Sequence, residues 1–181
     1  MKKFASILLA LTMILAMSIP AFATENTILT INDSVDRTYN GYQLLKLTTS
    51  LKCDDATHDH GDTCYNYAYT VNEKYEEILQ TLAGEEDIIE YLAGQSGDNA
   101  DGTYGSLRGV ADDIYRAILE DADIDPDADN LTGTDIIEQG YWLFADVTDL
   151  SGGDAANSLV ILDTKGEDEL TLTPTVGLPT L

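Results

Sequence analysis

Three short segments in the last part of the chain have the composition of β-strands. Tyr141–Val147 and Ser158–Asp163 are rich in aromatic and β-branched side chains, which favour the extended backbone of a strand. Glu169–Thr173 alternates apolar side chains with threonine, and Pro174 then interrupts the pattern because proline lacks the N–H group that a sheet ladder needs. The segments therefore predict a β-sheet that leads into a linker.

The middle of the chain has helical periodicity instead. Apolar residues follow Asn72 at spacings of three and four positions, which predicts a short helix with Asn72 as its N-cap and Gly84 at its end. A second helix is predicted to begin with the acids Glu85–Asp87 and to end at Gly94, and a third helix is predicted to begin at Ser106. The apolar stripe of the third helix consists of Leu107, Val110, Ile114, Ala117 and Ile118.

The order of these elements indicates a fold class. Strands precede and follow the helices, which predicts an α+β protein in which an antiparallel β-sandwich carries a helical insertion. Tyr65, Tyr67 and Tyr69 share one face of an early strand, and we expect them to pack under the helices near Ile78 and Ile114. The alternative is an exposed platform on which sugars stack.

The first residues have the features of a secretory signal peptide. Lys2 and Lys3 precede the apolar run Phe4–Ala16, and Ala21–Ala23 has the A-x-A pattern of a cleavage site. We therefore expect residues 1–23 to be removed and the mature protein to be secreted and extracellular. An uncleaved membrane anchor is disfavoured because the apolar run is too short.

The chain is strongly acidic. It has 33 Asp and Glu against 9 Lys and Arg, a net charge of −24 over 181 residues. Nucleic acids and anionic lipids are disfavoured as partners, because their binding depends on Lys and Arg that neutralise phosphate. We expect the charge to provide solubility, with weak and non-specific uptake of divalent cations.

Two cysteines enclose a polar loop. In a secreted protein Cys53 and Cys64 are expected to form a disulfide, worth about 3 kcal/mol in the chain-entropy model. The alternative is a tetrahedral metal site completed by His58 and His60. The spacing lacks the short Cys-x-x-Cys knuckle of such sites, so we favour the disulfide and expect neither a metal nor a cofactor.

The sequence gives little indication of enzymatic chemistry. It contains no G-x-S-x-G, H-E-x-x-H, P-loop or dinucleotide-binding motif. Alternate aspartates in Asp121–Asp129 match the start of an EF-hand loop, but Pro126 replaces the turn glycine and Thr132 replaces the bidentate glutamate. We therefore predict a solvated acidic loop and a protein that is not an enzyme.

Four segments together resemble a known family. The G-Y-W-L sequence at Gly140–Leu143, the S-L-V sequence at Ser158–Val160 and the step at Leu178–Pro179 are similar to the end of one particular domain. It is the N-terminal domain of the shaft subunits of sortase-assembled Gram-positive pili, the isopeptide-forming fimbrial proteins. Thr38–Lys46 is similar to an early strand of that domain.

This resemblance implies a fold, a role and partners. It implies that residues 24–175 form an antiparallel Ig-like β-sandwich with a helical insertion. Residues 176–181 are then the start of a linker to a further domain of a longer surface protein. The implied role is a non-enzymatic structural domain of a fimbria, pilus or cell-wall adhesin, with neighbouring subunits and a sortase as partners. The alternative is a secreted sandwich module that binds a glycan or a host protein.

The family joins its subunits through a lysine that follows an x-Pro step. Thr175 occupies that position here, and its hydroxyl is a weaker nucleophile than an amine, so we do not expect sortase to join subunits at this residue. Lys165 is the nearest amine, but we expect it to be an ordinary exposed turn residue.

The family also forms an internal amide between a buried lysine and an Asn or Asp. Lys46 is the only lysine deep within a predicted strand, where it is expected on the same face as Tyr42 and Leu44, and Asn157 is a conceivable partner. We expect instead that Lys46 is an edge residue or extends its amine to solvent.

Overall fold

The structure, a computed structural model, describes residues 26–31, 37–50, 66–98, 103–121, 123–148 and 158–172. They fall into two compact units, and the smaller unit contains only residues 48–50 and 66–68 of them. In that unit the Thr48 hydroxyl donates a hydrogen bond of 2.8 Å to the Ala68 carbonyl. The other described residues belong to the larger unit.

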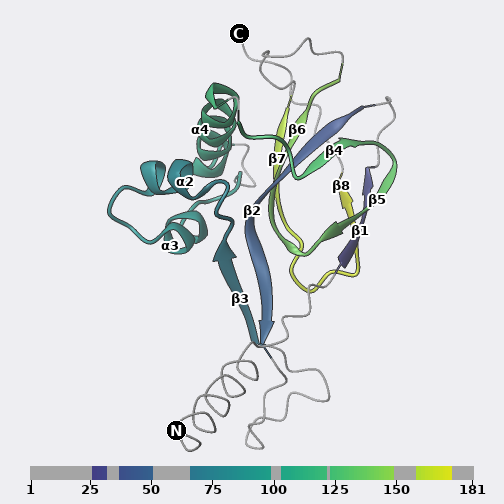
Figure 1. Ribbon diagram of the computed structural model, residues 1–181, viewed down its shortest axis with the longest axis horizontal. Helices are drawn as coiled ribbons and strands as arrows, with labels where there is room; N and C mark the ends of the chain where they lie inside the picture. The colour runs from purple at the N-terminus through teal and green to yellow at the C-terminus, as the bar shows by residue number, and fades with distance from the viewer. Residues whose placement is uncertain are drawn as a thin grey trace, which may run out of the picture. The chain divides into compact units, whose positions relative to one another are not determined.

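The larger of two sheets consists of β2 (Tyr39–Ser50), β3 (Asn66–Val71), β4 (Ala128–Leu131), β6 (Gly140–Asp146) and β7 (Leu159–Asp163). The strands lie in the order β3-β2-β6-β7, and β4 pairs with β2 beside this path (Figure 1). The pairs β2–β4, β2–β6 and β6–β7 are antiparallel. β6 is therefore an inner strand with partners on both sides.

The smaller sheet places the first described strand between two later ones. β1 (Asn26–Ile31) lies between β5 (Thr134–Glu138) and β8 (Glu169–Leu172). The pair β1–β5 is antiparallel, whereas β1–β8 is parallel. Both neighbours of β1 in this sheet therefore come from the part of the chain that follows the helices.

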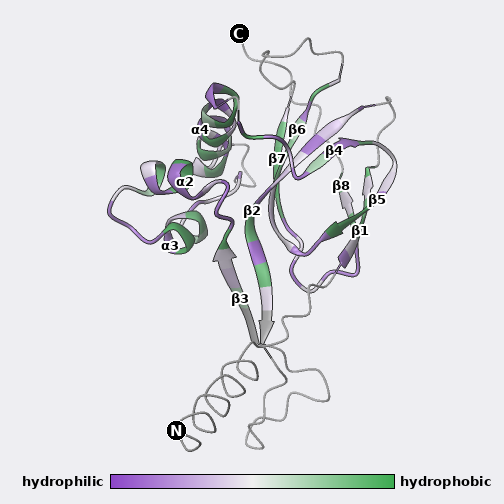
Figure 2. Cartoon of the chain, viewed as in Figure 1, coloured by the Kyte–Doolittle hydropathy of each residue, from purple (hydrophilic) through white to green (hydrophobic). Residues whose placement is uncertain are grey.

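Three helices lie together beside the larger sheet (Figure 1). They are α2 (Glu76–Ala83), α3 (Ile88–Ala93) and α4 (Ser106–Glu120). Each carries both hydrophobic and hydrophilic residues, as Figure 2 shows. The apolar face of α4 is buried through Val110, Ala111, Ile114, Tyr115 and Ile118, as expected for an amphipathic helix that covers a sheet.

Two separate hydrophobic cores lie on opposite faces of the larger sheet. The helix-side core contains Tyr42, Leu44, Leu45, Tyr75, Leu79, Ile88, Leu92, Val110, Ala111, Ile114, Tyr115, Ile118, Leu143 and Ala145. The sheet-side core contains Leu29, Ile31, Tyr39, Leu131, Ile137, Trp142, Phe144 and Leu172. The second set comes from both sheets, so the two sheets share one core.

β6 contributes to both cores because successive side chains of a strand point to opposite faces. Leu143 and Ala145 belong to the helix-side core, whereas Trp142 and Phe144 belong to the sheet-side core. Leu143, Phe144 and Ala145 are fully buried. Around β6, the larger sheet is thus a middle layer with the helices on one face and the smaller sheet on the other.

The prediction of an α+β fold is confirmed, since the helices between residues 76 and 120 interrupt a series of mostly antiparallel strands. The predicted C-terminal strands correspond to β6, β7 and β8, and the early predicted strands to β2 and β3. β1, β4 and β5 were not predicted. β4 and β5 contain Asp, Asn and Glu, which are depleted in strands, so their composition resembles that of a loop.

The predicted N-cap role of Asn72 is wrong. α2 begins at Glu76, and its N-cap position is Tyr75, which makes no capping hydrogen bond through its side chain. Asn72 is instead buried beside β2, where its Nδ2 donates to the Gln43 carbonyl over 2.8 Å and its backbone N–H donates to the Leu44 carbonyl over 3.1 Å. Buried carbonyls need such donors, and this need decides the place of Asn72.

The carbonyls that Asn72 satisfies belong to a β-bulge in β2. Gln43 is opposite Trp142 and Leu45 is opposite Tyr141, so Leu44 is one extra residue in β2. Leu44 and Leu45 are consequently both buried in the helix-side core. Every side chain after the bulge lies on the face opposite to the one that simple alternation predicts.

Candidate functional site

A groove of about 360 Å³ is lined by residues of β5 and of the larger sheet. Its lining includes Gln43, Lys46, Asp127, Ile136, Glu138 and Trp142. Gln43 and Trp142 are buried and belong to the base of the groove, whereas Ile136 is 73% exposed at its rim. The indole Nε1 of Trp142 donates to the Glu138 carbonyl over 2.9 Å and connects the base to β5.

The bulge in β2 brings Lys46 to this groove. Lys46 is opposite Gly140, two positions before Trp142 on β6, so it shares a face with Trp142. The expectation that Lys46 shares a face with Tyr42 and Leu44 is therefore wrong, because the extra residue in β2 reverses the alternation. Lys46 is exposed, and its ammonium makes no ion pair with any residue that the structure describes.

Asp127 fixes one wall of the groove. Its carboxylate accepts hydrogen bonds from the Gln43 backbone N–H over 2.9 Å, from Lys74 Nζ over 3.0 Å and from the Tyr75 hydroxyl. Burial, with a further contribution from Asp127, raises the pKa of the Tyr75 hydroxyl, so this group stays protonated and donates. The carboxylate thus ties the beginning of α2 to β2.

A second polar cluster involves the predicted tyrosine row. The Tyr69 hydroxyl donates to the Asp163 carboxylate, and Asp163 is opposite Tyr141 in the sheet. Burial and, after it, the hydrogen bond to Asp163 raise the pKa of Tyr69. Tyr69 and Tyr141 are partly buried against the helix-side core, which agrees with packing for Tyr69. The side chains of Tyr65 and Tyr67 lie outside the described part of the chain.

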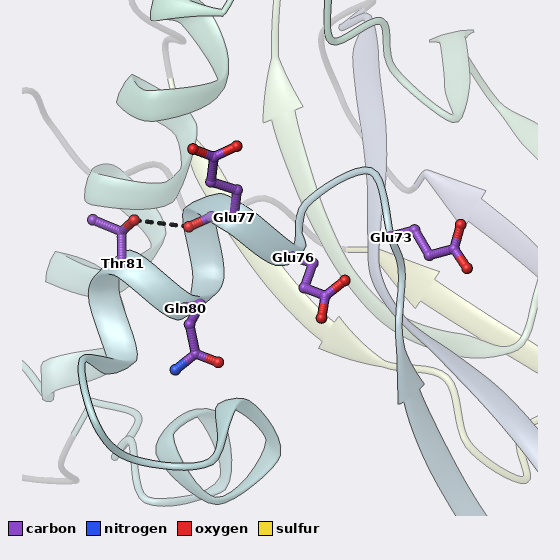
Figure 3. Close-up of a pocket in the computed structure, with 5 residues that line it drawn as sticks. All are labelled: Glu73, Glu76, Glu77, Gln80 and Thr81. Atoms are coloured by element: carbon purple, nitrogen blue, oxygen red, sulfur yellow. Dashed lines mark hydrogen bonds between the residues drawn. The ribbon is translucent and has the colours of Figure 1, made fainter.

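An acidic depression of about 490 Å³ lies on α2 and the turn before it. It is lined by Glu73, Glu76, Glu77, Gln80 and Thr81 (Figure 3). The Thr81 hydroxyl donates to the Glu77 carbonyl over 2.8 Å. Figure 3 shows the Glu77 side chain pointing away from that of Glu76, so the carboxylates do not converge on one point.

Acidic side chains elsewhere also stay apart. Within the described ranges, no group of three or more His, Cys, Asp or Glu side chains is placed to hold a metal ion. In the predicted acidic loop, Asp121 accepts a hydrogen bond from the Asp123 backbone N–H, and Asp127 belongs to the wall of the groove. Among the residues that the structure describes, no helix is long and apolar enough to cross a membrane.

Several predicted site residues lie outside the described residues. They are the cysteines Cys53 and Cys64, the histidines His58 and His60, the possible amide partner Asn157 and the sortase-motif position Thr175. The signal peptide predicted at residues 1–23 is outside them as well. Lys165 is described: it is exposed in the turn between β7 and β8, and its backbone N–H donates to Asp163.

The comparisons with known proteins do not assign the chain to a family. No protein-family model matches the sequence, and the search of curated proteins found no match. The resemblance to pilus shaft subunits therefore stays a prediction. The sequence does not predict that Asp127, Ile136 and Trp142 line one groove, since only the pairing of distant strands brings them together.

Proposed function

We propose that this chain is a non-enzymatic, extracellular structural domain of a fimbrial, pilus or cell-wall adhesin subunit. The finer fold that goes with this proposal is an Ig-like β-sandwich with a helical insertion. Two sheets that share a core, with helices over the outer face of the larger sheet, support it. Three of the four segments that carry the family resemblance fall on strands β2, β6 and β7, and the fourth, Leu178–Pro179, lies outside the described residues.

The parallel pairing of β1 with β8 carries the proposal. Ile28 is opposite Glu169 and Ile31 is opposite Leu172. In a parallel pair, the beginning of β1 and the end of β8 lie at opposite ends of the ladder. Tension applied through these two ends therefore shears the strands past each other and strains all their hydrogen bonds together. This geometry suits a subunit that transmits force along a fibre, because breaking the bonds one at a time requires less force.

Single-molecule stretching tests this mechanical role. With handles attached before β1 and after β8, we expect unfolding at high force. The matched control uses handles at Thr30 and Thr171, which lie side by side on the same pair, so that pulling separates the strands one bond at a time. We expect the control to unfold at a several-fold lower force. Equal forces in the two geometries would remove the mechanical argument.

A sortase reaction tests the family role separately. With a pilin sortase and a partner that carries a sorting signal, we expect no joining at Thr175, because a hydroxyl is a weak nucleophile near neutral pH. Thr175→Lys supplies the amine and should allow joining if the neighbouring surface is that of a pilin. High-mass ladders from the unchanged chain that map to Lys165 would make this exposed turn lysine the joining residue.

A glycan-binding or protein-binding module is the second candidate function. The observation that favours it is the cluster of Tyr69, Tyr141 and Asp163, which combines aromatic rings that a sugar could stack on with a carboxylate that could accept its hydroxyl hydrogen bonds. A glycan array tests it with Tyr69→Phe and Tyr69→Ala. Binding that Tyr69→Ala abolishes, at unchanged thermal stability, would favour this function over the structural one.

A further inference from the structure

The outer edge of β5 has backbone groups that pair with none of the described strands. The Ile28 N–H donates to the Asp168 carbonyl, so the backbone groups of Ile28 point toward β8 and away from β5. Ile136, which is opposite Ile28, must then point its own N–H and C=O away from β1. β5 is the last strand of its sheet, so these groups face outward.

The same reasoning applies to every second residue of β5. Thr134, Ile136 and Glu138 all point their backbone groups outward, and their side chains lie on the exposed face of the sheet. The Glu138 carbonyl is occupied by the Trp142 indole. The N–H and C=O of Ile136 point away from β1, and they make no hydrogen bond to a described residue on their outer side. A partner strand opposite Ile136 would gain both bonds.

The groove beside this edge contains one of the few basic residues of the chain. Lys46 lines it together with the carboxylates of Asp127 and Glu138, and Lys74 lies next to Asp127; the whole chain has only 9 Lys and Arg. Lys74 is paired with Asp127, and Lys46 makes no ion pair with Glu138 or with any other described residue, so its exposed ammonium is available to a ligand. The groove can therefore accept an acidic side chain that most of the surface would repel.

We infer that the groove binds an extended peptide segment of a partner protein, which adds a strand to β5 and places an acidic side chain against Lys46. The backbone of the peptide pairs with Ile136, and its inward side chains lie over Trp142. A second copy of the whole chain is a less favourable partner for this edge, because two molecules with a net charge of −24 repel each other. This binding role goes beyond the proposed structural function and does not depend on it.

Trp142 reports on the groove, since it is the only tryptophan in the chain. The probe is the peptide acetyl-Thr-Val-Thr-Asp-Thr-amide, in which valine and aspartate share one face of a strand. Titration into the purified protein should change the Trp142 fluorescence in a saturable way. A peptide with lysine in place of aspartate should bind about tenfold more weakly, as should a peptide N-methylated at its central residue.

Two variants of the protein test the two contacts. Ile136→Pro removes the outward N–H without removing a bond to β1, and proline is tolerated on edge strands. It should weaken binding about tenfold relative to its control Ile136→Thr, which keeps the N–H. Lys46→Glu should weaken binding of the aspartate peptide and restore binding of the lysine peptide. If Ile136→Pro does not fold, the N-methylated peptide provides the same test.

Three results would overturn the inference. The first is no saturable fluorescence change up to millimolar peptide. The second is equal affinity of the N-methylated and unmodified peptides, because the edge of β5 would then not pair with them. The third is a dimer in sedimentation experiments without peptide that Ile136→Pro dissociates, which would assign the edge to a second copy of this chain.

Discussion

The two cores of the larger unit share β6 but are assembled from very different parts of the chain. Most of the helix-side core comes from one continuous stretch between Tyr75 and Ile118, whereas the sheet-side core combines residues from Leu29 to Leu172. Their contacts differ too. Tyr42 makes edge contacts with Tyr75 and Tyr115 in the first core, whereas Trp142 stacks on Phe144 in the second. Local sequence patterns can therefore predict the first core but not the second.

The largest expected effect comes from removing a side chain of the sheet-side core. Phe144→Ala should lower the free energy of unfolding by about 3–5 kcal/mol, because Phe144 is fully buried. Since β6 contributes to both cores, urea unfolding followed by tryptophan fluorescence and by far-UV circular dichroism should shift together. Ile136→Ala, at a site that is 73% exposed, is the control and should change stability by less than about 0.5 kcal/mol. A helix signal that keeps its original midpoint in Phe144→Ala would mean that the two cores unfold independently.

High pH should weaken the helix-side core through its tyrosines. Burial, and after it the neighbouring Tyr115, raises the pKa of Tyr42 from 10.0 to about 12. The folded state thus holds this proton more tightly than the unfolded state. The raised pKa therefore contributes to the free energy of unfolding, on the order of 3 kcal/mol in total. This contribution is present in full below pH 10 and is lost as the pH rises toward 12.

Tyr42→Phe removes this titration. The free energy of unfolding of the variant should fall less steeply between pH 10 and pH 12 than that of the unchanged protein. Ile114→Val is the control, because it removes a methylene group from the same core without changing a titrating group. Parallel pH profiles for Tyr42→Phe and the unchanged protein would contradict the assignment.

Asp127 connects the helix-side layer to β2, and its loss should have an intermediate effect. Asp127→Ala removes the acceptor of the Gln43 N–H, of Lys74 and of the Tyr75 hydroxyl, and should cost about 1–3 kcal/mol. Denaturant unfolding measures this loss, with the exposed Asp129→Ala as control. A double-mutant cycle with Tyr75→Phe isolates the hydroxyl contact, and additive effects of the two changes would argue against it.

The smallest expected effect is local to one helix. Asp87 caps α3 by accepting hydrogen bonds from the backbone N–H groups of Ile89 and Glu90. Asp87→Ala should therefore cost about 1 kcal/mol in thermal or denaturant unfolding, whereas Glu86→Ala next to it should have little effect. An equal loss in both variants would indicate a charge effect rather than the loss of a cap.

The same comparison explains which parts of the fold were predictable. Asp87, Gly94 and the stripe through Ile114 are local signals, and the helices they predict are present. The bulge at Leu44 has no local signal, because Leu44 and Leu45 are both apolar and either could be the extra residue. That single residue decided the position of Lys46, and with it the composition of the groove. β5 lacks a local signal for a related reason. Ile136 and Ile137 are adjacent apolar residues, and the sequence does not show which of them faces the core.

The central position of β1 has a consequence for how the protein reaches its folded state. The Thr27 hydroxyl donates to the Glu167 carbonyl across 140 positions of sequence, and both neighbours of β1 come from the C-terminal part of the chain. Contacts between such distant residues are slow to form, because the intervening chain must first be ordered. During synthesis the helices can form early, whereas β1 has to wait without a sheet partner until residues 134–172 have emerged. The rate of folding is then set by the return of the chain to its first strand.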